Sequence, residues 1–137
     1  MAEGFARHYY PDQTFYSAGM NPSQKVNPHA IIVMKEKQIN ISSHEPKHLV
    51  KAILSKEIPL DYVVTVCGNA DEDCPNFNKK EPYLGTRVVH VGFDDPPEIA
   101  KNVEGEEEKL NCYRRVRDEI EEFIKNLMET LPKLDSR

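Results

Sequence analysis

The sequence predicts a single α/β domain with a parallel sheet. Segments with helical periodicity alternate with short apolar segments, which is the pattern of strands connected by helices. Two of the short segments, residues 61–66 and 87–91, are apolar at nearly every position, as expected of strands covered on both faces of a parallel sheet. A chain of 137 residues can bury one sizeable core but not two. We therefore expect residues 1–137 to form one domain.

The segments before the first of these strands predict three helices and one further strand. Residues 1–10 have a helical pattern, and the β-branched and aromatic segment 14–17 is predicted to be a strand. Asn27-Pro28 predicts a helix start, because asparagine caps helices and proline suits the first helical position. The apolar run that follows could be a strand, but the cap and the charged residues behind the run favour a helix. Residues 45–54 carry apolar side chains at helical spacing.

The C-terminal third is predicted to be one long amphipathic helix. Acidic residues 106–108 crowd its first turn, where the helix dipole favours negative charge. Arg114, Arg115 and Arg117 are expected on its solvent side, with phosphate binding as the alternative role. The apolar residues that define the helix follow at three- and four-residue steps: Leu110, Tyr113, Val116, Ile120, Phe123, Leu127 and Leu131.

Composition excludes several classes of function. The chain has 18 basic and 23 acidic residues and a net charge of −5, which argues against nucleic acid as a partner. No apolar run approaches the roughly 18 residues of a membrane span, and no leader pattern precedes the first helix, so we expect a cytoplasmic protein with no membrane partner. Its three cysteines are too few for a secreted disulfide scaffold.

Cys67 and Cys74 are the most informative residues of the sequence. They lie seven residues apart, the first at the end of a predicted strand and the second in a polar loop with Gly, Asn and Pro. A loop of this length could bring one thiol onto the other, as a thiol relay requires. Two alternatives remain open: packing cysteines that never meet, and a zinc site completed by His44 or His48, although the spacing is wider than in the usual zinc knuckle.

A second group of candidate residues follows the strand at 87–91. Ligands of parallel sheets bind at the carboxyl ends of the strands, and both Cys67 and Asp94-Asp95 fall at such ends. We therefore expect them to border the same crevice. An Asp-Asp-Pro-Pro sequence is also ordinary turn chemistry, so these residues alone do not define a catalytic site.

Together these motifs resemble the thioredoxin-coupled arsenate reductases, which share the fold of the low-molecular-weight tyrosine phosphatases. The resemblance covers nearly the whole chain and implies a three-layer α/β sandwich. The Cys67/Cys74 pair beside an Asp-Pro loop is quite specific, because the plain phosphatases generally lack that pair. The shared segments occur in the same order: residues 1–4, 16–19, 26–28, 61–67, 74–75, 92–96 and 113–120.

The resemblance implies an enzyme with a cysteine relay and no cofactor. A nucleophilic cysteine in a Cys-x5-Arg loop attacks arsenate, Cys67 attacks the adduct and releases arsenite, and Cys74 then forms a Cys67–Cys74 disulfide that thioredoxin reduces. Asp95 would be the acid that protonates the leaving oxygen. Glu3 and Ser17 would support the anion loop.

The sequence departs from this family at the primary nucleophile. None of its three cysteines has an arginine six residues further on, and the strand that carries the Cys-x5-Arg loop has no counterpart. We therefore expect a domain that lacks its central first strand, whose recorded start is an internal methionine, and which is inactive alone. The alternatives are a phosphatase-like hydrolase and a non-catalytic or split relative.

A second departure concerns potassium. Some members of the family bind K⁺ through a glutamate and a serine that match Glu3 and Ser17, together with an aspartate. Lys47 stands about where that aspartate occurs. Because an ammonium group could do the electrostatic work of the cation, we predict no metal site.

Overall fold

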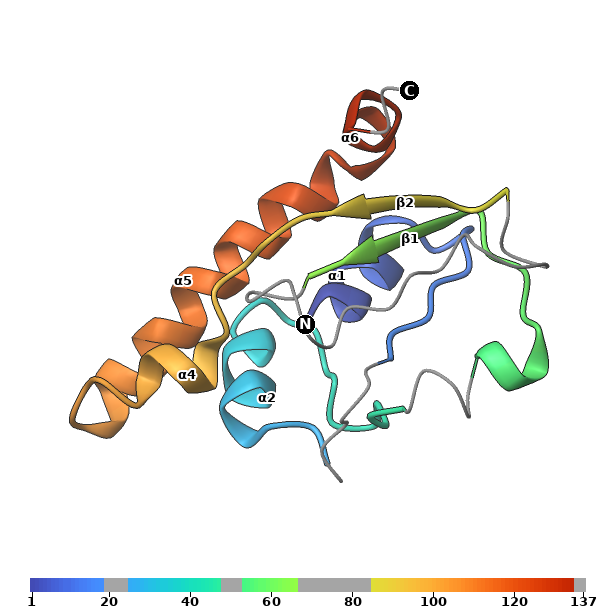
Figure 1. Cartoon of the computed structure of the whole chain (residues 1–137). Coiled ribbons are helices and arrows are strands. Elements are labelled where there is room, and N and C mark those ends of the chain that lie inside the picture. Colours follow the sequence, from blue (N-terminus) through green and yellow to red (C-terminus); the bar gives the residue numbers. More distant parts are fainter. Residues whose placement is uncertain (19–24, 48–52, 67–84, 135–137) are drawn as a thin grey trace.

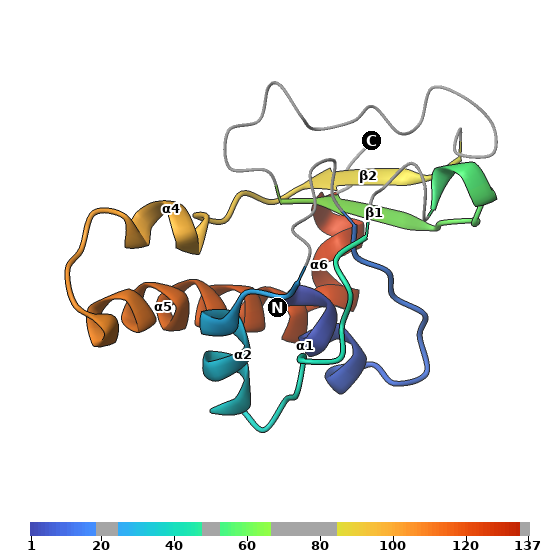
Figure 2. The same ribbon diagram turned by 90° about the horizontal axis from the view of Figure 1, so that it is seen from below.

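The computed structural model describes residues 1–18, 25–47, 53–66 and 85–134. Two parallel strands lie beside a long helix, and shorter helices pack around that helix (Figure 1). Helices α1, α5 and α6 lie on one side of the strand pair (Figure 2). The elements are α1 (Ala2–Tyr9), α2 (Pro28–Lys35), the 3₁₀ turn η1 (Leu54–Lys56), β1 (Tyr62–Thr65), β2 (Arg87–His90), α4 (Pro96–Ala100), α5 (Glu106–Lys125) and α6 (Leu127–Leu134).

The parallel pairing of the two predicted strands is confirmed. Tyr62 lies opposite Arg87 at one end of the ladder, and Thr65 lies opposite His90 at the other. Successive side chains alternate between the two faces of the pair. One face joins the main core beside the helices, whereas Val63 and Val88 on the other face pack with a small cluster around Ile53.

Strand β1 is less buried than its sequence predicts. All four of its residues are half-buried, and Val66 just beyond it is 47% exposed. In the part of the chain that the structure describes, β1 has a strand neighbour on the β2 side alone, so its other edge is not shielded by a paired strand.

The main core lies where α5 meets α1 and α2. Its largest fully buried side chains are Phe5 from α1, Val33 and Met34 from α2, Val116 from α5, and Ile41. Burying a side chain of this size contributes about 1.5–3 kcal/mol relative to exposure. Helix α5 therefore acts as the scaffold against which α1, α2 and α4 are placed. Within the described ranges no helix is both long enough and apolar enough to cross a membrane.

The predicted start of α2 is confirmed in atomic detail. The side-chain Oδ1 of Asn27 accepts a hydrogen bond of 2.8 Å from the backbone N–H of His29, and Pro28 occupies the first helical position. The cap satisfies one of the N–H groups that a helix start leaves without a partner, which is worth about 1 kcal/mol.

Three predicted elements differ from the structure. Residues 14–17 are not a strand; their one backbone contact that the structure gives is from Arg7 Nη2 to the carbonyl of Phe15, at 3.2 Å. A strand needs a ladder partner, and β propensity alone does not supply one. The predicted helix over residues 45–54 falls largely on residues outside the described ranges, and of its last part η1 begins at Leu54.

The C-terminal helix is two helices rather than one. It breaks at Asn126, whose Nδ2 donates a 3.0 Å hydrogen bond to the carbonyl of Glu122. A side-chain amide that competes in this way for a helical carbonyl favours the end of a helix. Helix α6 then restarts with the N–H groups of Glu129 and Thr130 bonded to the carbonyl of Asn126.

The expectation that Arg117 faces solvent is wrong. The residue is 7% exposed, and its Nη1 donates to the carbonyl of Val33 at 3.0 Å and to Glu36 Oε1 at 2.7 Å. Burial opposes the charge, but the hydrogen bonds to Asp118 and Glu36 outweigh it and raise the pKa of the guanidinium. Arg117 therefore links α5 to the end of α2.

Candidate functional site at the carboxyl ends of the strands

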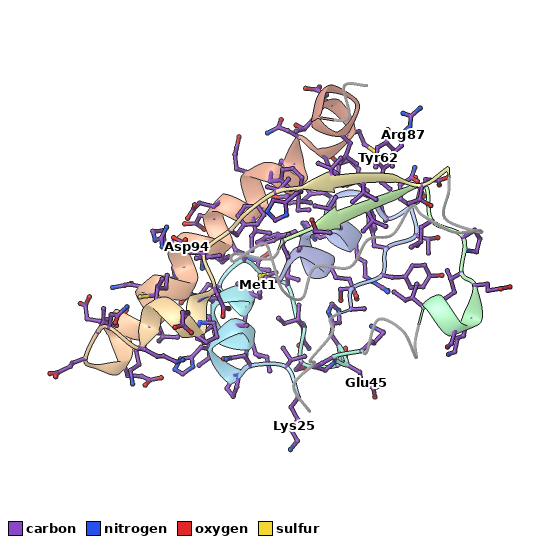
Figure 3. The ribbon with its side chains drawn as sticks, viewed as in Figure 1. Met1, Lys25, Glu45, Tyr62, Arg87 and Asp94 are labelled. Carbon is purple, nitrogen blue, oxygen red and sulfur yellow. The ribbon has the colours of Figure 1, made fainter. Side chains whose placement is uncertain are left out.

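The candidate site begins where β2 leaves the sheet. Pairing continues one residue beyond the strand, because the N–H of Val91 donates to the carbonyl of Thr65 at 2.9 Å. Figure 3 shows Asp94 beyond the carboxyl end of the pair, with Tyr62 and Arg87 at the opposite end. The ring of Phe93 packs edge-on against Phe123 of α5, with 6.0 Å between ring centroids. This contact ties the segment before α4 to the scaffold helix.

Asp95 occupies the N-cap position of α4 without using its side chain as a cap. Its backbone carbonyl accepts from the N–H groups of Glu98 and Ile99, at 3.0 and 3.1 Å, whereas its carboxyl group makes no capping hydrogen bond. Asp95 is also exposed. Its position is thus fixed by the backbone while the carboxyl group can serve an oxygen atom of a bound molecule, as a general acid must.

The neighbouring Asp94 has a different environment. Its Oδ2 accepts a hydrogen bond of 2.8 Å from Arg115 Nη2, and Arg115 Nη1 also pairs with Glu119. The hydrogen bond to Asp94 raises the pKa of Arg115. Exposed pairs of this kind contribute at most about 1 kcal/mol, so their effect is on orientation more than on stability. Of the two adjacent aspartates, Asp94 is held by α5 and Asp95 is the one with an uncommitted capping group.

A buried tyrosine connects this region to α2. Tyr113 of α5 is 3% exposed, and its hydroxyl oxygen accepts from Asn27 Nδ2 at 3.0 Å. Burial is the main cause that raises the pKa of Tyr113, and the negative charge of Asp95 adds to it while the Asn27 hydrogen bond opposes it. His29 stacks on the same ring, with centroids 5.1 Å apart. Sequence patterns identified Tyr113 as part of an apolar helix face and gave no signal of these contacts.

His90 and Thr65 lie at the same end of the strand pair as Asp94. The Nδ1 atom of His90 lies 2.8 Å from the Oγ1 atom of Thr65. His90, expected to be structural, is exposed. The contact joins the last residues of the two strands and so fixes the rim from which the next segments start.

A separate cluster joins α1 to residues 17 and 44–47. The hydroxyl of Ser17 donates to Glu3 Oε1 at 2.6 Å, so the structure brings together the two residues expected to support the anion loop. Glu3 also lies near three cationic side chains, those of Arg7, His44 and Lys47.

Two of the three predicted catalytic residues, Cys67 and Cys74, lie outside the described residues, as does His48. Asp95 is described as above. Cys112 is a free, half-buried cysteine that packs against the core, as expected. Among residues 1–18, 25–47, 53–66 and 85–134, no group of three or more His, Cys, Asp and Glu side chains is arranged to hold a metal ion.

Comparison with known proteins defines the class to which this fold and site belong. Residues 1–136 match the low molecular weight phosphotyrosine protein phosphatase family. The chain belongs to that family, and the resemblance predicted from the motifs is confirmed.

Within the family, the chain is similar to proteins named arsenate reductase. It is 42% identical over 131 residues to the arsenate reductase of Halalkalibacterium halodurans and 40% identical over 131 residues to that of Bacillus subtilis. Each match covers 95% of this chain and 86% of the relative.

The fold is similar to solved structures as well. An arsenate reductase in the reduced state gives a TM-score of 0.64 at 23% identity, over 95% of this chain and 86% of that chain. An arsenate reductase in the phosphate binding state gives 0.63 at 22% identity, with the same coverage. The expected low-molecular-weight phosphatase-like α/β fold is thereby confirmed.

Proposed function

We propose that this protein is an arsenate reductase in which Cys67 and Cys74 form the relay and Asp95 is the general acid. The observation that carries the proposal is the identity of about 40% with arsenate reductases over 86% of their length. The seven-residue spacing of the two cysteines and the uncommitted carboxyl group of Asp95 at the strand ends support it. The same class of reaction accounts for thioredoxin as the partner and the cytoplasm as the location.

The electrons of the reaction balance across three thiols. A first thiolate bonds to arsenic(V), and an oxygen leaves as water with a proton from Asp95. The Cys67 thiolate then bonds to the first sulfur while the sulfur–arsenic electron pair goes to arsenic, which leaves as arsenite. Cys74 displaces the first sulfur from Cys67, and a dithiol of thioredoxin reduces the resulting Cys67–Cys74 disulfide. Because no cysteine here has an arginine six residues on, the first thiol comes from a Cys-x5-Arg segment outside these 137 residues.

The test uses protein that carries the Cys-x5-Arg segment, supplied with thioredoxin and its reductase. We expect arsenate-dependent consumption of NADPH that Cys67→Ser and Cys74→Ser abolish. Cys112→Ala is the matched control and should retain turnover, because Cys112 packs in the core rather than at the strand ends. Normal turnover in either relay variant would reject the mechanism.

Asp95 is tested in the same protein. Asp95→Asn removes the acid but keeps the N-cap geometry, and we expect the turnover rate to fall by roughly 10²- to 10⁴-fold with an unchanged melting temperature. A phosphatase-like hydrolase is the second candidate, favoured by the family description itself. Efficient cleavage of an aryl phosphate that is unaffected by Cys74→Ser would select the hydrolase.

A further inference from the structure

The carboxylate of Glu3 is the meeting point of three segments of the chain. Its Oε1 atom accepts from Ser17 and lies 3.7 Å from Lys47 Nζ. Its Oε2 atom lies 3.1 Å from Arg7 Nε and 3.6 Å from His44 Nδ1. The side chain of Glu3 is only 6% exposed, so these contacts replace water around a charged group.

The donor chemistry of this cluster does not fit a bound alkali cation. A carboxylate beside a hydroxyl is the kind of oxygen set that a hard cation takes. Here both carboxylate oxygens are already engaged, and Arg7 and Lys47 have no lone pair with which to coordinate a cation. Two permanent positive charges within 4 Å of the same carboxylate would also repel a further cation.

The ionisation of Glu3 is consistent with this arrangement. Burial alone would raise the pKa of Glu3. The hydrogen bond from Ser17 and the charges of Lys47, Arg7 and His44 outweigh burial and hold the pKa below its ordinary value. Lys47 is the largest of the three charge effects, because causes other than burial and the hydroxyl rank behind it.

We propose that Lys47 is a built-in cation, which takes the place at Glu3 that a monovalent metal ion occupies in some members of the family. The ammonium group neutralises the buried carboxylate from within the chain and ties residues 44–47 to α1. The stability of this protein therefore does not depend on K⁺. The inference concerns a cluster other than Asp95 and the two relay cysteines, so it holds or fails independently of the reaction.

The experiment compares melting temperatures in potassium, sodium and tetramethylammonium chloride at equal ionic strength. We expect the same melting temperature for the native chain in all three salts. Lys47→Gln and Lys47→Asp should each melt roughly 4 to 8 °C lower in tetramethylammonium, since they leave the buried carboxylate short of a partner. Potassium should restore part of that loss, more so in Lys47→Asp, which adds an oxygen ligand.

Lys101→Asp is the control, because it makes the same charge change at an exposed side chain that pairs only with Glu98 among the described residues. It should show no preference among the salts. A native chain that melts higher in potassium than in the other salts would overturn the proposal. So would the failure of both Lys47 variants to gain stability from potassium, including failure to fold in it.

Discussion

The buried guanidinium of Arg117 gives the sharpest prediction for stability. The N–H of Lys37 bonds to the carbonyl of Met34 rather than to that of Val33, so Arg117 is the residue that satisfies Val33 at the end of α2. Replacing Arg117 by methionine keeps the aliphatic stem and removes the donors. We expect the variant to leave a buried carbonyl without its partner and Glu36 without one of its two arginines.

The magnitude follows from the carbonyl. A buried acceptor left unsatisfied costs about 1–3 kcal/mol, and the lost charge-assisted bond to Glu36 adds to this. We expect Arg117→Met to lower the free energy of unfolding by about 2–3 kcal/mol, which is a large fraction of the 5–15 kcal/mol typical of a domain. The assay is urea unfolding, in which the midpoint should fall while the slope stays constant.

Arg115→Met is the matched control on the same helix. Arg115 is half exposed, and its partners Asp94 and Glu119 are exposed too, so its removal should cost less than about 1 kcal/mol. If Arg117→Met were no more destabilising than Arg115→Met, the contact with Val33 would not have the role derived from it here.

Two further perturbations test the packing and charge of α1. Gly4→Ala should destabilise the protein by about 1 kcal/mol in urea unfolding despite alanine's better helix propensity, because the added Cβ would meet Ile41 Cγ2 at 2.8 Å; a stabilised variant would contradict this. Glu3→Gln should lower stability most at neutral pH: with a depressed pKa in the folded state, Glu3 stabilises the protein fully above about pH 4.5 and loses that effect as pH falls through its folded pKa. Unfolding measured from neutral to acidic pH should show the two proteins converging, and a constant difference would refute the assignment.

The elements that sequence patterns predicted well are those set by local chemistry. The start of α2 depends on two adjacent residues, Asn27 and Pro28, and needs no knowledge of the rest of the fold. The strands at 62–65 and 87–90 follow from apolar runs too short for helices, and their parallel pairing from the helical segments elsewhere in the chain.

The elements that it predicted wrongly depend on neighbours distant in sequence. Segment 14–17 has the composition of a strand, but a strand exists only with a partner. Arg117 has the polarity of a solvent-facing residue, and its burial arises because Val33 and Glu36 present an acceptor and a charge from another helix. The break at Asn126 depends on one side-chain bond that the apolar periodicity does not register.

The candidate site divides in the same way. The position of Asp95 after β2 could be predicted, because the carboxyl end of a parallel strand is defined by the chain itself. The contact between Asn27 and Tyr113 could not, because the two residues are 86 positions apart and neither has a signature of the pairing. Whether Cys67 and Cys74 meet stays a prediction.

The amide of Asn27 restricts what can stand at its position. Aspartate and serine begin helices as well as asparagine in general, since all three offer an oxygen to the first turn. A carboxylate has no hydrogen to give to the phenol oxygen of Tyr113, and a single hydroxyl is too short to serve both groups. The entrance of α2 and the middle of α5 are therefore coupled through one side chain, and a substitution that looks conservative for the helix would separate them.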